Sequence, residues 1–312
     1  MGNIWGNATL PEEQMTVLEE KFLQNFVMRL ARGPDVTVHK SLEKFTSLSS
    51  SDNLRQHFEK RKKKAGKRAA DWIKSLAEKL GGLTSAPELA GLGALAIAVF
   101  IDTVSSSPPE ESTKDALRCV FAEEKASEVW DQIDECLKRC MMHVRNKEQL
   151  RSDMERMECQ LSAALTKLKN SMVRDGYLSS EALRAWVNGA AFHIQMLIHL
   201  VRLGGIQTCD PVERILLAYR SDLDTLFNKH REIIEAKCIM GEQSYCMAPK
   251  NRFLVDEDSK WYVMDPITSY EKYFEAYYDH RYGRQQTEVQ QHFSDVRENL
   301  QSLVHQRGSF NI

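Results

Sequence analysis

A run of thirteen consecutive uncharged residues, Leu89 to Ile101, most constrains how this chain can fold. It lies between Glu88 and Asp102, in a chain in which 28% of the residues are charged. A helix that is apolar around its whole circumference must be surrounded by other apolar groups. The run therefore predicts either the central helix of a helical core or a segment made to meet lipid.

The apolar run is expected to lie within a helix that covers residues 86–104. Ser85 and Glu88 have the spacing of a capping box at its start, and the prolines of Ser105–Pro109 end it. Thirteen helical residues rise roughly 20 Å, whereas the hydrocarbon core of a bilayer is roughly 30 Å thick. The run is therefore too short to cross a bilayer as one helix.

Two interpretations of this helix stay open. In the first, a bundle of amphipathic helices encloses it as a core element. In the second, it leaves the core and inserts into a membrane, with glycines at Gly81–Gly82 and Gly91–Gly93 allowing the movement. The large side chains that would then meet lipid are Leu89, Leu92, Leu95, Ile97, Val99, Phe100 and Ile101.

Apolar residues repeat every three to four positions along most of the remaining chain, which predicts amphipathic helices. An N-terminal helix is expected to stop near Gly33–Pro34, a second to run from Asp52 to Leu80, and a third from Pro109 to Val144. Further long helices are expected over residues 150–173, 180–203 and 211–237, and Ser179–Glu181 are expected to cap the second of them. Short links between them predict antiparallel neighbours.

The C-terminal region has a different pattern. Phe253–Val255 and Trp261–Met264 flank a polar loop and predict a small β-hairpin, and two helices follow over residues 269–282 and 286–305. The predicted fold is mainly all-α: an elongated antiparallel bundle that sheathes the apolar helix, with this hairpin and its helices at the end. The expected regions are residues 1–50, 51–240 and 241–312.

A basic cluster lies in the second predicted helix, where seven of nine residues are Lys or Arg. Its members are Lys60, Arg61, Lys62, Lys63, Lys64, Lys67 and Arg68. Three interpretations stay open: contact with an anionic leaflet, worth about 1 kcal/mol per basic residue, a nuclear-import or nucleic-acid patch, and a solvated helix face. Aromatic residues are not interleaved with the basic ones, which counts against nucleic acid.

The N-terminus offers a second membrane signal. Gly2 would become an acylation site after loss of Met1, although the pattern asks for Ser or Thr where this chain has Gly6. One myristoyl chain binds membranes only marginally, so stable anchoring needs a second element such as a basic cluster.

The start of the chain has no pattern of a secretory signal, and an odd number of cysteines, seven, fits reduced thiols. We therefore expect a cytoplasmic protein, which includes the inner face of membranes.

No motif of an enzyme stands out in the sequence. Cys136, Cys140 and His143 share one helical face and are residue types that bind zinc, but a fourth ligand is not evident. We interpret them as core residues and expect no metal, no cofactor and no catalytic residue.

Two resemblances complement the residue patterns. The run ALRCVFAEEKASEVWDQIDECLKR resembles uncharacterised helical proteins of fish, over roughly residues 80 to 240. Long helices around one wholly apolar helix are also similar in architecture to α-helical pore-forming proteins of the haemolysin E type. The second likeness implies a helix that emerges at a membrane, although those proteins are generally exported.

The sequence thus predicts a non-enzymatic, cytosolic helical protein. The expected partner is an anionic membrane surface, bound through the basic cluster and Gly2, with an apolar helix that inserts. The alternative is a soluble scaffold in which this helix is only core and the basic cluster binds an acidic protein or a second copy of the chain. Nucleic acid is not an expected partner.

Overall fold

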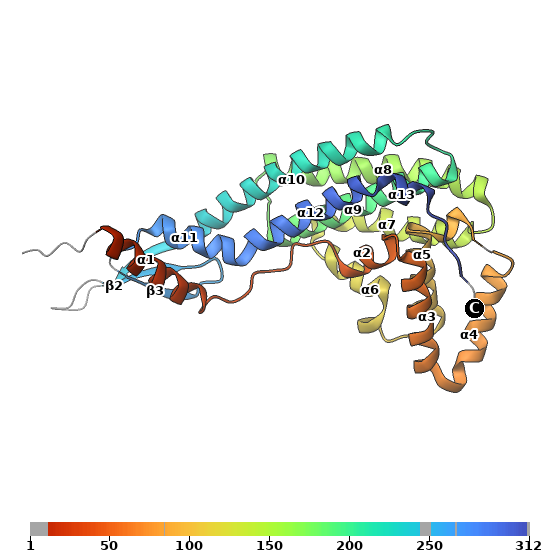
Figure 1. Ribbon diagram of the computed structural model, residues 1–312, viewed down its shortest axis with the longest axis horizontal. Helices are drawn as coiled ribbons and strands as arrows, with labels where there is room; N and C mark the ends of the chain where they lie inside the picture. The colour runs from red at the N-terminus through yellow and green to blue at the C-terminus, as the bar shows by residue number, and fades with distance from the viewer. Residues whose placement is uncertain (1–11, 84, 244–250, 266, 311–312) are drawn as a thin grey trace, which may run out of the picture. The chain divides into compact units, whose positions relative to one another are not determined.

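The computed structural model describes residues 12–83, 85–243, 251–265 and 267–310 (Figure 1). The protein is mainly α-helical, as predicted, with one small antiparallel sheet. The chain divides into two compact units. The first combines the described part of Met1–Pro34 with His230–Gln285, and the second combines Asp35–Lys229 with the described part of Gln286–Ile312.

The first unit is built around the three-stranded sheet. Its elements are α1 (Glu12–Val27), the end of α10 (Asp210–Lys237), β1 (Ile239–Gln243), β2 (Asn251–Val255), β3 (Trp261–Met264), α11 (Tyr270–Tyr278) and the π-helical turn η6 (Asp279–Gly283). The strands pair in the order β1-β2-β3, and Phe253 lies opposite both Gly241 and Val263. The sequence did not predict β1, because Ile239 and Met240 are exposed and the strand lacks alternation of apolar and polar residues.

Aromatic side chains and one arginine hold this unit together. The ring of Phe26 on α1 meets the ring of Tyr273 on α11 at a centroid distance of 4.8 Å. Arg281 is buried, and its guanidinium contacts carboxylates of Asp258 at 3.0 Å and Glu257 at 3.3 Å. The acidic loop between β2 and β3 is therefore fixed by a buried cation.

The second unit is entirely helical in its described residues apart from one isolated bridge. Its longer helices are α3 (Ser50–Ala65), α4 (Ala69–Leu80), α5 (Leu92–Val104), α7 (Ser127–Met142), α8 (Lys147–Arg174), α9 (Ser180–Leu203), α10 (Asp210–Lys237) and α12 (Arg284–Glu298). Its shorter ones are α2 (Lys40–Thr46), α6 (Thr113–Arg118), α13 (Leu300–His305) and the turns η1 (Gly66–Arg68), η2 (Pro87–Leu89), η3 (Pro109–Glu111), η4 (Cys119–Phe121) and η5 (Glu124–Ala126).

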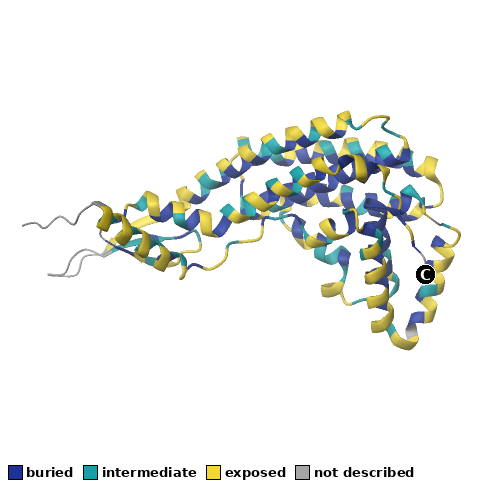
Figure 2. Cartoon of the chain, viewed as in Figure 1, coloured by how far each residue is buried: buried dark blue, intermediate teal, exposed yellow. Residues whose placement is uncertain are grey.

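Helix α9 forms the most buried part of this unit (Figure 2). It is apolar on nearly every side, so it packs between other helices, α8 and α13 among them. Ser179 caps it by accepting a hydrogen bond from the backbone N–H of Ala182 at 3.0 Å, as the sequence predicts. The predicted spans of α8, α9 and α10 agree with the structure to within a few residues.

Two predicted continuous helices are broken in the structure. The helix expected from Asp52 to Leu80 turns at Gly66, which has φ +53° and ψ −125°, a conformation that side-chain-bearing residues rarely adopt. The helix expected from Pro109 to Val144 is instead a series of short turns and α6 before α7 begins at Ser127.

The predicted start of the apolar helix is also wrong. Helix α5 begins at Leu92, and Ser85 makes no capping box with Glu88. The backbone of Ala86 exchanges two hydrogen bonds with Gly308, both 3.0 Å long, which holds this segment in an extended conformation. Leu89 consequently lies in η2, outside α5.

Candidate functional site

The apolar helix α5 is enclosed by protein. It packs against α2, α3 and α7. Leu92, Leu95, Ile97 and Ile101 have no exposed surface. Leu89 and Val99 are also buried, and Phe100 is half-buried. The side chains that the sequence offered for insertion are thus core residues in this structure, with Phe100 the most accessible.

The basic cluster lies where α3 turns back into α4. Figure 1 shows these two helices joined through η1 as a hairpin that extends from the unit. Its exposed lysines, which we call the basic tip, are Lys60, Lys62, Lys63, Lys64 and Lys67. Arg61 does not belong to this surface, because it is only 4% exposed. The side chain of Arg68 lies outside the described residues, as does all of Gly2.

Most lysines of the basic tip have no acidic partner among the described residues. Lys60, Lys63 and Lys67 form no ion pair with a described residue, and Lys62 lies 3.8 Å from Glu59. Positive charge therefore accumulates at the turn of the hairpin.

Below the tip, Asp102 joins α3 to α5. The Nε of Arg61 donates to Oδ1 of Asp102 at 2.7 Å, and Nε2 of His57 lies 2.7 Å from the same oxygen. The backbone N–H of Thr113 donates to Oδ2 at 2.6 Å. Burial alone would raise the pKa of Asp102, but the hydrogen bonds from His57 and Thr113 hold it below its usual value.

The same cluster continues toward solvent through Glu111. Arg61 Nη1 lies 3.0 Å from Oε2 of Glu111, and Arg61 Nη2 donates to the Glu111 carbonyl oxygen. Lys64 Nζ contacts Oε1 of Glu111 at 2.7 Å, and this contact lowers the pKa of Glu111. We call His57, Arg61, Asp102 and Glu111 the ionic cluster. It connects the basic tip to the end of the apolar helix.

The ionic cluster was not predicted from the sequence. One signal was present: His57 and Arg61 are four residues apart and therefore share a face of α3. Asp102 is the acid that ends the apolar run, so a buried basic partner could have been expected.

Of the zinc-type residues, Cys136 on α7 and His143 directly after α7 make other contacts. Cys136 is buried, and its Sγ donates to Sδ of Met154 at 3.6 Å. Nε2 of His143 lies 3.4 Å from Oδ2 of Asp153. Across the described ranges, no group of three or more His, Cys, Asp or Glu residues could hold a metal ion.

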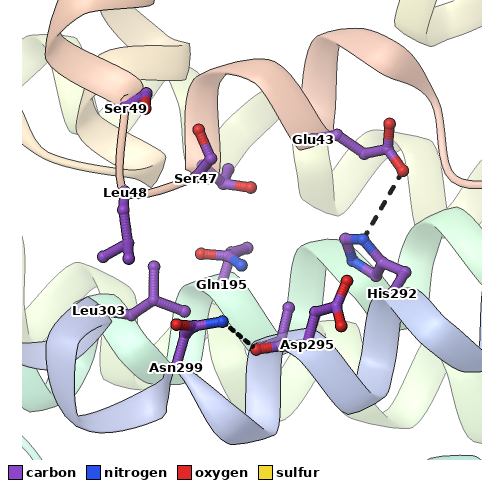
Figure 3. Close-up of a pocket in the computed structure, with 11 residues that line it drawn as sticks. Glu43, Ser47, Leu48, Ser49, Gln195, His292, Asp295, Asn299 and Leu303 are labelled. Atoms are coloured by element: carbon purple, nitrogen blue, oxygen red, sulfur yellow. Dashed lines mark hydrogen bonds and ion pairs between the residues drawn. The ribbon is translucent and has the colours of Figure 1, made fainter.

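A cavity of about 320 Å³ lies in the second unit, between the α2–α3 turn and α12 (Figure 3). Gln195 of α9 lines it, and Gln195 Oε1 is buried without a hydrogen-bond partner among the described residues. Burial lowers the pKa of His292 to about 4, and burial together with Glu288 raises the pKa of Glu43. Nδ1 of His292 is 3.7 Å from Oε1 of Glu43, too far for a hydrogen bond. The cavity therefore presents a neutral imidazole and one buried acceptor, Gln195 Oε1, that has no partner among the described residues.

Comparison with known proteins assigns no family and no function to this chain. Within the described residues, no helix combines the length and the apolarity needed to span a membrane. The resemblances noted from the sequence stay predictions, because no protein family, no curated protein and no solved structure matches this chain.

Proposed function

We propose that this protein is a non-enzymatic, cytosolic helical protein that binds anionic membrane surfaces peripherally through the basic tip. The observation that carries the proposal is the gathering of exposed lysines at one helix turn, where three of them have no ion-pair partner among the described residues. At about 1 kcal/mol per lysine, five lysines supply on the order of 5 kcal/mol. Binding through the tip alone is then weak and reversible.

The ionic cluster supports this role by giving the hairpin a fixed base. Arg61 makes one contact with Asp102 and two with Glu111, so α3 is anchored directly below the tip. A rigid hairpin loses less conformational entropy on binding than a flexible basic tail. Acylation of Gly2 would supply the second element that stable anchoring requires.

Insertion of α5 is a second candidate function. It is favoured by the absence of any charged residue between Leu92 and Ile101. In this proposal, neighbouring helices form an elongated antiparallel bundle that sheathes α5 until the ionic cluster opens. The competing proposal is a scaffold in which α5 never leaves the core, and the burial of α5 from Leu92 to Val99 favours it. There the basic tip binds an acidic protein, or the chain pairs with a second copy.

Sedimentation with liposomes tests the proposed function. The protein is mixed with neutral or anionic vesicles at low and at high salt. The test variant carries Lys60→Glu, Lys63→Glu and Lys67→Glu, since these lysines make no ion pair with a described residue. The matched control carries Arg145→Glu, Lys147→Glu and Arg174→Glu, three exposed basic residues outside the tip.

We expect the wild type and the control to bind anionic vesicles at low salt, and the tip variant to stay in solution. Binding through the tip should weaken steeply at physiological ionic strength, because exposed charges are screened. Binding that survives high salt, together with release of an enclosed dye, would favour insertion of α5. If the tip variant bound as well as the control, the proposed docking surface would be wrong.

A further inference from the structure

A second cavity opens beside the apolar helix. It has a volume of about 440 Å³ and lies between α5 and α7. Its floor consists of aliphatic side chains from both helices, with Ala96, Val99, Leu137 and Met141 all buried. Phe100 also lines it, which explains why this residue is the most accessible large side chain of α5.

The rim of this cavity is basic. Lys79 of α4, Lys114 of α6 and Lys138 of α7 line it together with one acid, Asp134. Asp134 contacts Lys114 at 2.6 Å and Lys138 at 2.7 Å, whereas Lys79 has no ion pair with a described residue. Three lysines against one aspartate leave a formal charge of +2 around the opening.

We propose that this cavity binds the anion of a free fatty acid. The aliphatic chain would lie on the floor, and the carboxylate would sit among the three lysines. A pocket of this size with an apolar lining and a few polar groups at one end is typical of small-molecule sites. The thioethers of Met141 and Met142 line the cavity, and methionine adapts to chains of different length.

The charge of the rim selects between amphiphiles. A carboxylate replaces solvent around the lysine ammonium groups, whereas a cationic head would be repelled by the net charge of +2. The site uses none of the lysines of the basic tip. The inference therefore goes beyond the proposed function and does not depend on membrane docking.

Calorimetric titration of the full chain with monomeric decanoate tests this inference. We expect saturable binding, and an affinity that rises about fourfold for each added methylene from octanoate to dodecanoate, because a buried methylene contributes about 0.8 kcal/mol. Decylammonium, which has the same chain and the opposite charge, should bind at least tenfold more weakly. Equal affinity for the two heads, or uptake that never saturates, would overturn the proposal.

Two variants test where the ligand binds. Lys79→Glu changes the rim by two charges, and at about fivefold per charge near 4 Å in water the affinity for decanoate should fall roughly 25-fold. The matched control is Lys74→Glu, an exposed lysine of the same helix that does not line the cavity, and its affinity should stay within twofold of wild type.

Thr103→Trp tests the chain-binding part of the cavity. Thr103 is exposed and lines the opening, so an indole there fills the space with little disturbance of the core. Saturable decanoate binding should disappear while the thermal unfolding curve stays unchanged. Wild-type affinity in both Lys79→Glu and Thr103→Trp would place the ligand elsewhere and refute the assignment.

Discussion

Arg61 and Asp102 form an ion pair in the interior of the second unit, with Nε and Oδ1 2.7 Å apart and neither side chain more than 5% exposed. The pair joins the helix that carries the basic tip to the end of the apolar helix. Removing one partner of a buried pair leaves an uncompensated charge, which typically costs about 3–5 kcal/mol. The pair therefore ties the C-terminal end of α5 to α3, together with His57 on the same helix.

Asp102→Asn should lower the free energy of unfolding by about 3–5 kcal/mol, because Arg61 would keep its charge without a buried partner. Urea unfolding measures this change. Arg61→Met combined with Asp102→Leu should recover a large part of the loss, since both buried charges are then removed. Lys64→Met serves as the control, because Lys64 is exposed and its contact with Glu111 is a surface ion pair, which contributes little to stability. Equal losses for Asp102→Asn and Lys64→Met would contradict a buried link.

Acid should destabilise the fold through His199. This side chain is fully buried, both ring nitrogens lack hydrogen-bond partners among the described residues, and burial with nearby Arg202 lowers its pKa from 6.5 to about 3. Acid therefore protonates His199 in the unfolded chain, whereas His199 in the folded chain stays neutral. Stability should fall as the pH drops below 6.5 and continue to fall toward pH 3, by about 1.4 kcal/mol per pH unit for this group.

Unfolding curves at pH 7, 6 and 5 measure this slope. His199→Leu should reduce it. His39, His230 and His292 also contribute to the slope, because burial lowers the pKa of His39 and lowers the pKa values of His230 and His292 to about 4. Asp102 acts in a lower window: its pKa is held below 3.8, so its contribution is present above that value and is lost only as the pH falls through the lowered pKa. An unchanged slope in His199→Leu would show that this histidine is not the sensor.

Gly91 and Gly66 provide a matched pair for testing how tightly α5 is packed. Their backbone angles are nearly the same, with φ +56° and ψ −116° at Gly91 and φ +53° and ψ −125° at Gly66. An added Cβ meets nothing within 4 Å at Gly66 but collides with the Arg202 guanidinium at Gly91. Gly66→Ala should cost about 1–3 kcal/mol from backbone strain alone.

Gly91→Ala should cost clearly more than Gly66→Ala, as measured by thermal or urea unfolding. The added methyl group would displace Arg202, whose Nη1 donates to the Ala90 carbonyl at 3.1 Å and whose Nε donates to the Leu303 carbonyl at 2.7 Å. The difference between the two variants isolates this crowding from strain. Equal costs would mean that Arg202 moves aside freely.

Thiol labelling would detect release of α5. Cys136 and Cys140 are buried on α7, which packs against α5, whereas Cys119 and Cys159 are exposed. In solution, a maleimide should modify the two exposed thiols and leave the two buried ones unmodified, as read by peptide mass spectrometry. If α5 inserts, anionic vesicles should make Cys136 and Cys140 reactive. Continued protection in bound protein would leave α5 in the core.

The local pattern of residues was sufficient to predict much of the helical fold. The spacing of apolar residues located α8, α9 and α10, and Ser179 capped α9 as expected, because helix period and capping depend on residues within about four positions of each other. The composition of Leu89–Ile101 determined that this segment must be surrounded by apolar groups, although lipid and protein satisfy that requirement equally.

Tertiary structure decided the rest through contacts between distant residues. In the sequence, Arg61 is one more member of a basic run. In the structure, Asp102, which is 41 positions away, accepts its hydrogen bond in the interior. Helix α5 starts six residues later than residue 86 because Ala86 pairs with Gly308 at the far end of the chain. A residue pattern shows which groups must be buried or paired. Packing decides which residue becomes the partner, because an unpaired buried charge costs several kcal/mol.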